Sequence, residues 1–251
     1  MFFDQSPFEV KLEWGQKGAR IASDRGDIVI IVDVLSFSST VVTAVEYGAE
    51  IYPYPPPIND DAKAYADRIG AKMVWGRAES IKYDGHSLSP LSFTASDKGQ
   101  KFIMCSLNGA ACSRIASKVP ALLVGCPLNA TAVVNKANYL RTKLKSDITV
   151  IACGEKWPDA ADSEYQLRPG IEDYLGAGMI LAKLNGSKSS EAEVCIGAYE
   201  YSKNKLAELI WDSTSGRELR ERGYGQDVIH CSQVDYSAIV PVLCGDSFAN
   251  A

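Results

Sequence analysis

The sequence predicts an α/β protein, a three-layer sandwich in which helices flank a largely parallel or mixed sheet. Short apolar runs alternate with segments of helical period along most of its 251 residues. The composition, with 46% hydrophobic and 23% charged residues, is that of an ordinary globular protein. A chain of this length buries a core that needs no metal or disulfide to hold it. These three observations favour a well-packed domain over a disordered or fibrous chain.

The first elements form a β-α-β unit. Apolar runs at 9–14 and 27–34 predict strands, a helical period at 40–47 predicts a helix, and a third strand at 51–54 ends at a run of prolines. Asn59 then opens a helix at 60–69, because its side chain accepts hydrogen bonds from free backbone N–H groups. After it we predict strands at 72–75, 101–106, 121–124 and 148–153, and helices at 110–117, 130–143 and 171–184. Polar, irregular stretches follow residues 75 and 153.

The last third is more helical. Amphipathic segments predict helices at 191–203, 205–212 and 215–222, and the run 227–231 resembles a strand. No linker marks a domain boundary. The sequence therefore predicts one α/β domain over 1–251, with two tightly packed lobes as the alternative.

Charge and cysteine usage exclude several classes. The chain has 26 Lys and Arg against 31 Asp and Glu, a net charge of −5, and no cluster of four basic residues, which argues against nucleic acid or an anionic membrane as partner. No apolar run is long enough for a signal peptide or a membrane span. Seven cysteines without a C-x-x-C pair are expected to be buried thiols in a reducing compartment, so we predict a cytoplasmic protein without a zinc site.

Polar side chains follow four of the predicted strands. In parallel sheets, ligands bind beyond the carboxyl ends of the strands, where helices begin. Residues of this kind are Asp33, Ser36, Ser38, Ser39 and Thr40 after the second strand, Asn108 and Gly109 after 101–106, Asn129 after 121–124, and Glu172 and Asp173 in the helix turn that follows 148–153 and its loop. We expect them to meet at one polar rim of the sheet.

Helix starts and hydroxyl groups favour an anion such as phosphate, sulfonate or carboxylate at this rim. The carboxylates would repel it unless they hold a cation, so Asp33 with Glu172 or Asp173 predicts a Mg²⁺ site. Each residue also has a structural interpretation. Asp33 is suited to a turn, the Ser36 to Thr40 run to helix capping, the acidic pair to the helix dipole, and the asparagines to turns or caps. From the residues alone, the sequence predicts no more than a site that binds an anion.

Seven segments, taken in order, resemble the motifs of the 2-phosphosulfolactate phosphatase family. They are EVKLEWG at 9–15, VDVLSFSST at 32–40, HSLSP at 86–90, SLNG at 106–109, GCPLNA at 125–130, IED with GAG within 171–178, and the tail from RERG at 220–223 through Asp227 and Cys231 to Val240 and Pro241. The resemblance covers nearly the whole chain. The sequence departs from the commoner family pattern at Ser36, where that pattern has Arg, and at 86–90, where it has DLGNSP.

The resemblance implies a three-layer α/β fold and Mg²⁺-dependent hydrolysis of (2R)-2-phospho-3-sulfolactate to 3-sulfolactate and phosphate, on the coenzyme M pathway. It places metal and substrate at the rim and adds Ser89 to the predicted substrate-binding residues. Residue 35 is Leu, so the Asp-x-Asp pattern of aspartyl-phosphate enzymes is absent and we favour direct attack by a metal-activated water. Arg77 is the predicted basic clamp on the phosphate, with Lys156 and Arg168 in reserve.

Two alternatives remain open at this stage. The chain could be a non-catalytic binder of a sulfonated or phosphorylated metabolite, or a phosphatase for another α-hydroxy acid phosphate. The presence of Asp33, Glu172 and Asp173 together favours an enzyme, since a protein that only binds the metabolite does not need a full set of metal ligands. Either way the expected partner is a small anionic phosphorylated compound, and a homo-oligomer is compatible with the sequence.

Overall fold

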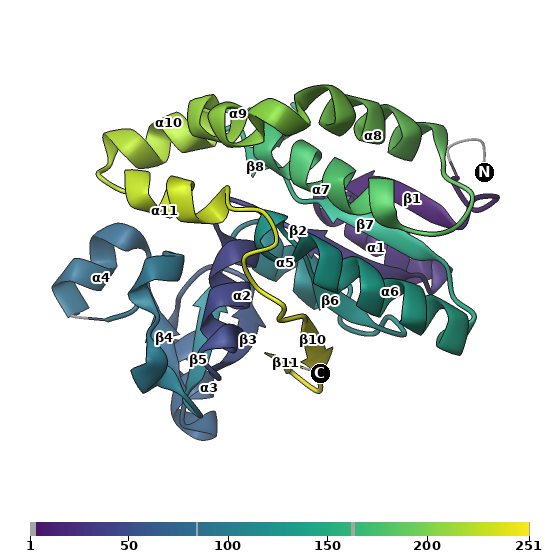
Figure 1. Ribbon diagram of the computed structural model, residues 1–251. Helices are drawn as coiled ribbons and strands as arrows, with labels where there is room; N and C mark the ends of the chain where they lie inside the picture. The colour runs from purple at the N-terminus through teal and green to yellow at the C-terminus, as the bar shows by residue number, and fades with distance from the viewer. Residues whose placement is uncertain (1–3, 84, 162–163, 251) are drawn as a thin grey trace.

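The computed structural model describes residues 4–83, 85–161 and 164–250, and it confirms the predicted α/β fold (Figure 1). Within these residues nine strands form one sheet in the order β1-β7-β2-β6-β10-β11-β3-β5-β4. Its strands are β1 (Val10–Trp14), β2 (Ile28–Val32), β3 (Glu50–Tyr54), β4 (Lys72–Val74), β5 (Lys101–Cys105), β6 (Leu122–Val124), β7 (Ile148–Ala152), β10 (Pro241–Cys244) and β11 (Ser247–Asn250). The short strands β8 (Glu155–Lys156) and β9 (Leu167–Arg168) pair separately.

The sheet is mixed because a hairpin joins two parallel groups. Strands β1, β7, β2 and β6 run parallel to one another, and so do β3, β5 and β4. Between the groups, β10 is antiparallel to β6, β11 is antiparallel to β10, and β3 is antiparallel to β11. Three successive reversals leave the two groups running in opposite directions.

Helices cover both faces of the sheet. The pleat of β2 divides its side chains: Ile28, Ile30 and Val32 join the core under one helical layer, and Val29 and Ile31 join the core under the other. The first layer includes α6 (Ala130–Leu144), α7 (Ile171–Lys183) and α8 (Ser190–Ser202), with α9 (Leu206–Asp212), α10 (Thr214–Glu221) and α11 (Gly225–Cys231) continuing from α8 (Figure 1). The second includes α1 (Gly15–Arg25), α2 (Phe37–Glu46) and α5 (Gly109–Ile115), while α3 (Asp60–Ile69) packs on β5.

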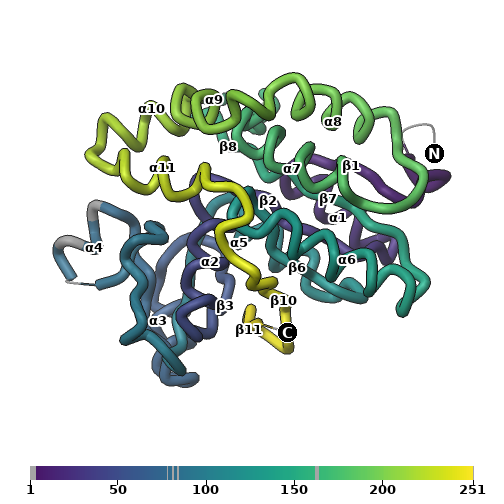
Figure 2. Tube along the Cα trace, in the orientation of Figure 1, coloured from purple at the N-terminus to yellow at the C-terminus, as the bar shows by residue number. Residues whose placement is uncertain are grey.

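The predicted strand at 227–231 is wrong, because these residues belong to helix α11. Asp227, Val228 and Cys231 are its buried side chains, and that spacing of one and three residues is helical. In Figure 2 the chain leaves α11, passes α2 and reaches the β10–β11 hairpin near the C-terminus.

Several further elements, among them the following, were not predicted. Helix α1 follows β1 directly, through Gly15 at φ +57°. Helix α4 (Arg77–Tyr83) lies in the stretch that was predicted as a polar loop. The β10–β11 hairpin has strands of only four residues. In the part of the chain that the structure describes, no helix has the length and apolarity to cross a membrane.

Candidate active site

Asp33 lies directly after β2, and its side chain bonds to the turn that follows β5, a strand of the other parallel group. Its side chain is buried, with 4% exposed. Oδ1 accepts the Phe37 N–H at 3.2 Å, and Oδ2 accepts the Gly109 N–H at 2.8 Å. Burial raises the pKa of Asp33 to about 6, and the nearby Glu172 carboxylate adds to the rise. The predicted meeting of the turns after β2 and β5 therefore occurs, although these strands belong to groups of opposite direction.

Gly109 allows this close contact. A Cβ atom at this position would lie 2.2 Å from Phe37 Cδ1 and 2.8 Å from Asp33 Oδ2. Any side chain would therefore push the backbone N–H away from the carboxylate. Gly109 positions Asp33 through its backbone.

Glu172 and Asp173 lie in the first turn of α7, and both are buried. Asp173 Oδ1 accepts the Val34 N–H at 2.7 Å, and Oδ2 accepts the Gly154 N–H at 2.8 Å. Burial, followed by repulsion from Asp33 and Glu172, holds the pKa of Asp173 well above its usual range. The predicted acidic residues thus gather at the carboxyl ends of β2 and β7, close enough to interact electrostatically.

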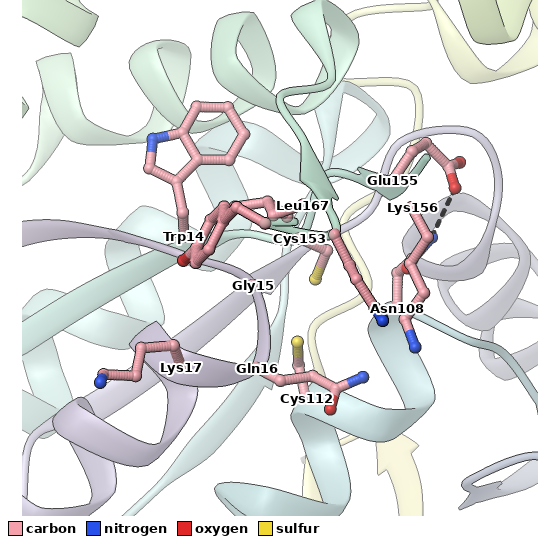
Figure 3. Close-up of a pocket in the computed structure, with 12 residues that line it drawn as sticks. Trp14, Gly15, Gln16, Lys17, Asn108, Cys112, Cys153, Glu155, Lys156 and Leu167 are labelled. Carbon is pink, nitrogen blue, oxygen red and sulfur yellow. Dashed lines mark hydrogen bonds between the residues drawn. The ribbon is translucent and has the colours of Figure 1, made fainter. Parts of the chain in front are cut away.

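Glu155, in β8, is a fourth carboxylate that the sequence interpretation missed. Its Oε2 accepts a hydrogen bond from Asn108 Nδ2 at 2.8 Å (Figure 3). Burial and then the charge of Asp33 raise the pKa of Glu155 to about 7. A signal was available, since Glu155 follows the 148–153 strand as closely as Asn108 follows 101–106.

The donor chemistry of these four carboxylates suits a hard cation. Within the described residues none of the four forms an ion pair, and their charges repel one another, which adds to the effect of burial in raising the pKa of Asp33, Asp173 and Glu155. The described residues also contain no group of three acidic, His or Cys side chains already converged for metal binding. Mg²⁺ in proteins uses one or two carboxylates and keeps several waters, so a fully protein-built cage is not required.

A cavity of about 790 Å³ opens beside two of these carboxylates, Asp33 and Glu155, whereas the predicted metal ligands Glu172 and Asp173 do not line it. Asp33, Ser36, Asn108 and Glu155 contribute to its acidic, polar side. Basic side chains also line it, namely Lys63, Arg77 and Arg222. The cavity therefore offers carboxylates and cationic groups to the same ligand, which is the combination that a metal-bound anion requires.

Several predicted substrate-binding residues do not line this cavity in the described structure. Ser38 Oγ donates to the Ile31 carbonyl at 3.1 Å and accepts the Asp33 N–H at 2.9 Å, and Ser39 Oγ donates to the Val34 carbonyl at 2.8 Å. Both are fully buried, as is Thr40, because α2 begins at Phe37 rather than at Thr40 as predicted. The Ser38 and Ser39 hydroxyl groups fix the turn that carries Asp33, whereas Thr40 Oγ1 has no hydrogen-bond partner among the described residues.

Asn129 is likewise fully buried, and apart from the Cys126 thiol, which donates to its Oδ1 at 3.8 Å, its hydrogen-bond partners are backbone groups. Its Oδ1 accepts the Cys126 N–H at 3.0 Å, and its Nδ2 donates to the Val124 and Ile239 carbonyls at 3.2 and 2.9 Å. Ser89 Oγ donates to a carboxylate of α11, Asp227, at 2.7 Å. Among the predicted substrate-binding residues, Ser36 and Asn108 have side chains on the cavity.

A second, smaller cavity of about 190 Å³ shares Asn108 and Glu155 with the first (Figure 3). Lys156, one of the reserve cations, lines it, together with Trp14 and Lys17. Arg168, the other, lies over the Trp157 ring at 5.8 Å and donates to Ser215 Oγ at 3.4 Å. Of the three predicted cations, only the preferred one, Arg77, lines the larger cavity.

Comparison with known proteins gives the family. A family model described as 2-phosphosulpholactate phosphatase matches residues 17–246. The chain belongs to the 2-phosphosulpholactate phosphatase family. This confirms the resemblance seen in the sequence, and it assigns the chain to the phosphoric monoester hydrolases.

Individual relatives match over most of their length. A protein of Pseudothermotoga lettingae named probable 2-phosphosulfolactate phosphatase is 33% identical over 226 residues, which cover 88% of this chain and 91% of that protein. A protein of the same name from Carboxydothermus hydrogenoformans is 30% identical over 217 residues, covering 85% and 84%. A third, from Thermotoga maritima, is 25% identical over 225 residues, covering 87% and 90%.

Proposed function

We propose that this chain hydrolyses 2-phospho-3-sulfolactate to 3-sulfolactate and phosphate with the help of Mg²⁺. The observation that carries the proposal is the cavity that the carboxylates of Asp33 and Glu155 line together with Arg77. Family membership supports the reaction and the substrate. The substrate carries a phosphate, a sulfonate and a carboxylate. A site for it must supply more positive charge than the basic residues that line the cavity can supply alone.

Asp33, Glu172 and Asp173 would hold the Mg²⁺. When bound, this ion would neutralise charge on the phosphate oxygens and lower the pKa of a water molecule. Asp33 is held ready for this by the N–H groups of Phe37 and Gly109. Arg77 would bind an anionic group of the substrate through its guanidinium.

The reaction also needs a proton at the leaving oxygen. Water attacks phosphorus, the ester P–O bond breaks, and the alkoxide of 3-sulfolactate must be protonated. Glu155 lines the cavity, and with its pKa near 7 it can hold a proton at neutral pH. Its Oε2 is bonded to Asn108, which leaves Oε1 to deliver the proton.

A phosphate-release screen over small phosphorylated acids tests this proposal. It should include 2-phospho-3-sulfolactate, 2-phospholactate and 3-phosphoglycerate, each with Mg²⁺ and with excess EDTA. We expect the highest kcat/KM for the sulfonated compound and loss of turnover in EDTA. Preference for another compound would replace the substrate, and undiminished turnover in EDTA would remove the metal. Binding without phosphate release would support the non-catalytic alternative.

A further inference from the structure

The buried carboxylate of Asp227 contacts Arg77. It belongs to α11, and 3% of the residue is exposed. Oδ2 accepts a hydrogen bond from Arg77 Nη2 at 3.1 Å, and Oδ1 accepts one from Ser89 Oγ at 2.7 Å. Both oxygens are therefore engaged by residues distant in sequence, and Asp227 itself is not among the cavity-lining residues that the structure describes.

Other contacts fix Arg77 in the same orientation. Its Nη2 also donates to Ser36 Oγ at 2.8 Å, and its guanidinium lies over the Tyr224 ring at 5.0 Å. The Tyr224 hydroxyl donates to the Arg77 carbonyl at 3.3 Å. These contacts join α4 to α11 and the turn before it, which lie side by side at the left of Figures 1 and 2.

Two donor nitrogens of Arg77, Nη1 and Nε, are not used by Asp227 or Ser36. Nη2 makes both of the side-chain hydrogen bonds described above, whereas Nε is buried and has no hydrogen-bond partner among the described residues. A buried donor without a partner is costly unless a ligand or water completes it. Both bidentate edges of a guanidinium include Nη2, so Nη1, which makes no hydrogen bond among the described residues, is left as a single donor for an anion.

We propose that Asp227 is the positioning residue for Arg77 and that Ser89 acts on the substrate only through Asp227. Arginine loses much side-chain freedom when it binds an anion, and a carboxylate that already holds Nη2 reduces that loss. The buried charge of Asp227 is compensated by Arg77, so the pair is maintained without substrate. This inference rests on the proposed function for the identity of the anion, but not for the Arg77–Asp227 geometry.

A double-mutant cycle separates positioning from a merely structural role. The variants are Asp227→Asn, Arg77→Ala and both together, with Asp212→Asn as the control, because Asp212 pairs with Arg217 on the surface. We expect Asp227→Asn to raise KM about tenfold while kcat changes less than about threefold. The double variant should have nearly the same KM as Arg77→Ala, because Asp227 acts through Arg77. Asp212→Asn should leave both constants unchanged.

Ser89→Ala gives a second test that leaves the charge pair in place. It should raise KM, as Asp227→Asn does, but by a smaller factor. In the Arg77→Ala background it should leave KM unchanged. This variant decides the question if Asp227→Asn does not fold. Additive effects of Asp227→Asn and Arg77→Ala, or a loss of thermal stability with an unchanged KM, would overturn the proposal.

Anion binding without turnover keeps the two proposals distinguishable. Inorganic phosphate is titrated by calorimetry into the wild type, Asp227→Asn and Asp212→Asn. If the wild type releases no phosphate from any compound, the proposed function fails, but weaker phosphate binding by Asp227→Asn alone would still support positioning. Equal binding by all three proteins would refute it.

Discussion

Replacing Asp33 by Asn is expected to stabilise the metal-free protein while reducing its turnover by orders of magnitude. In the wild type, burial and Glu172 raise the pKa of Asp33 from 3.8 to about 6, so the folded state binds its proton more tightly than the unfolded state does. Stability is then lost as the pH rises between these two values. Asn carries no charge, so the variant avoids this loss.

The size of the effect follows from the shift. Ionisation of Asp33 costs the folded state about 3 kcal/mol at pH 7.5 and about half of that at pH 5. An Asn side chain has one oxygen for the two N–H groups of Phe37 and Gly109, and losing one of these bonds costs about 1 kcal/mol. The variant should therefore be more stable than the wild type by about 2 kcal/mol at pH 7.5 and by less than about 1 kcal/mol at pH 5.

Urea denaturation in EDTA at the two pH values measures this difference. With saturating Mg²⁺ the difference in unfolding free energy between variant and wild type should become smaller or change sign, because a ligand that binds only the folded wild type stabilises it by mass action. Phosphate release in Mg²⁺ gives the turnover. A difference in unfolding free energy that does not grow from pH 5 to pH 7.5 would refute the electrostatic argument, and near-normal turnover of the variant would remove Asp33 from the site.

One reagent and one further variant test other features of the chain. Alkylating reagents should modify the exposed Cys244 in the folded protein and leave activity intact. The buried thiols should not react, because burial raises the pKa of Cys105 to about 11 and that of Cys126 to about 12. Mass spectrometry with parallel activity assays checks this, and loss of turnover on modification of Cys244 alone would contradict it. Gly109→Ala should cost about 1–3 kcal/mol and lower kcat, since the new Cβ would displace Phe37 or Asp33; unchanged stability and kcat would show that the contact is not needed.

The parts of the fold that could be predicted are those with a strong local pattern. Strand β2 is a run of five aliphatic residues, fully buried on both faces, and the polar turn after it was correctly placed. The β10–β11 hairpin could not be found this way, because its four-residue strands have no long period and their place between β6 and β3 depends on contacts far along the chain. The opposite direction of the two parallel groups follows from that hairpin and was therefore also outside the reach of sequence patterns.

The same limit applies to the site. Asp33, Glu172 and Asp173 were identified by their position after strands, and the structure gathers them. Glu155 was missed because the stretch after residue 153 has no periodic pattern, and its role depends on Asn108, which comes from the other half of the sheet. Position after a strand does not reveal whether a polar side chain faces the cavity or its own backbone.

Asn108 and Asn129 show this ambiguity most clearly, since both follow a strand and precede a helix. Asn129→Ala removes hydrogen bonds to three buried backbone groups, so we expect a loss of about 3 kcal/mol of stability with KM and kcat of the folded protein unchanged. Asn108 is half-buried and its Nδ2 contacts Glu155, so Asn108→Ala should change stability by less than about 1 kcal/mol.

The two variants should differ in their pH–rate profiles. The hydrogen bond from Asn108 lowers the pKa of Glu155, which otherwise rises through burial and the charge of Asp33. Its loss in Asn108→Ala should therefore move the limb of the profile that reports Glu155 to higher pH, whereas Asn129→Ala should leave the profile in place. Urea denaturation and steady-state kinetics from pH 5 to 9 on both variants make the comparison. If Asn129→Ala shifted the profile and Asn108→Ala only lost stability, the assignment of Asn108 to the cavity and Asn129 to the backbone would be reversed.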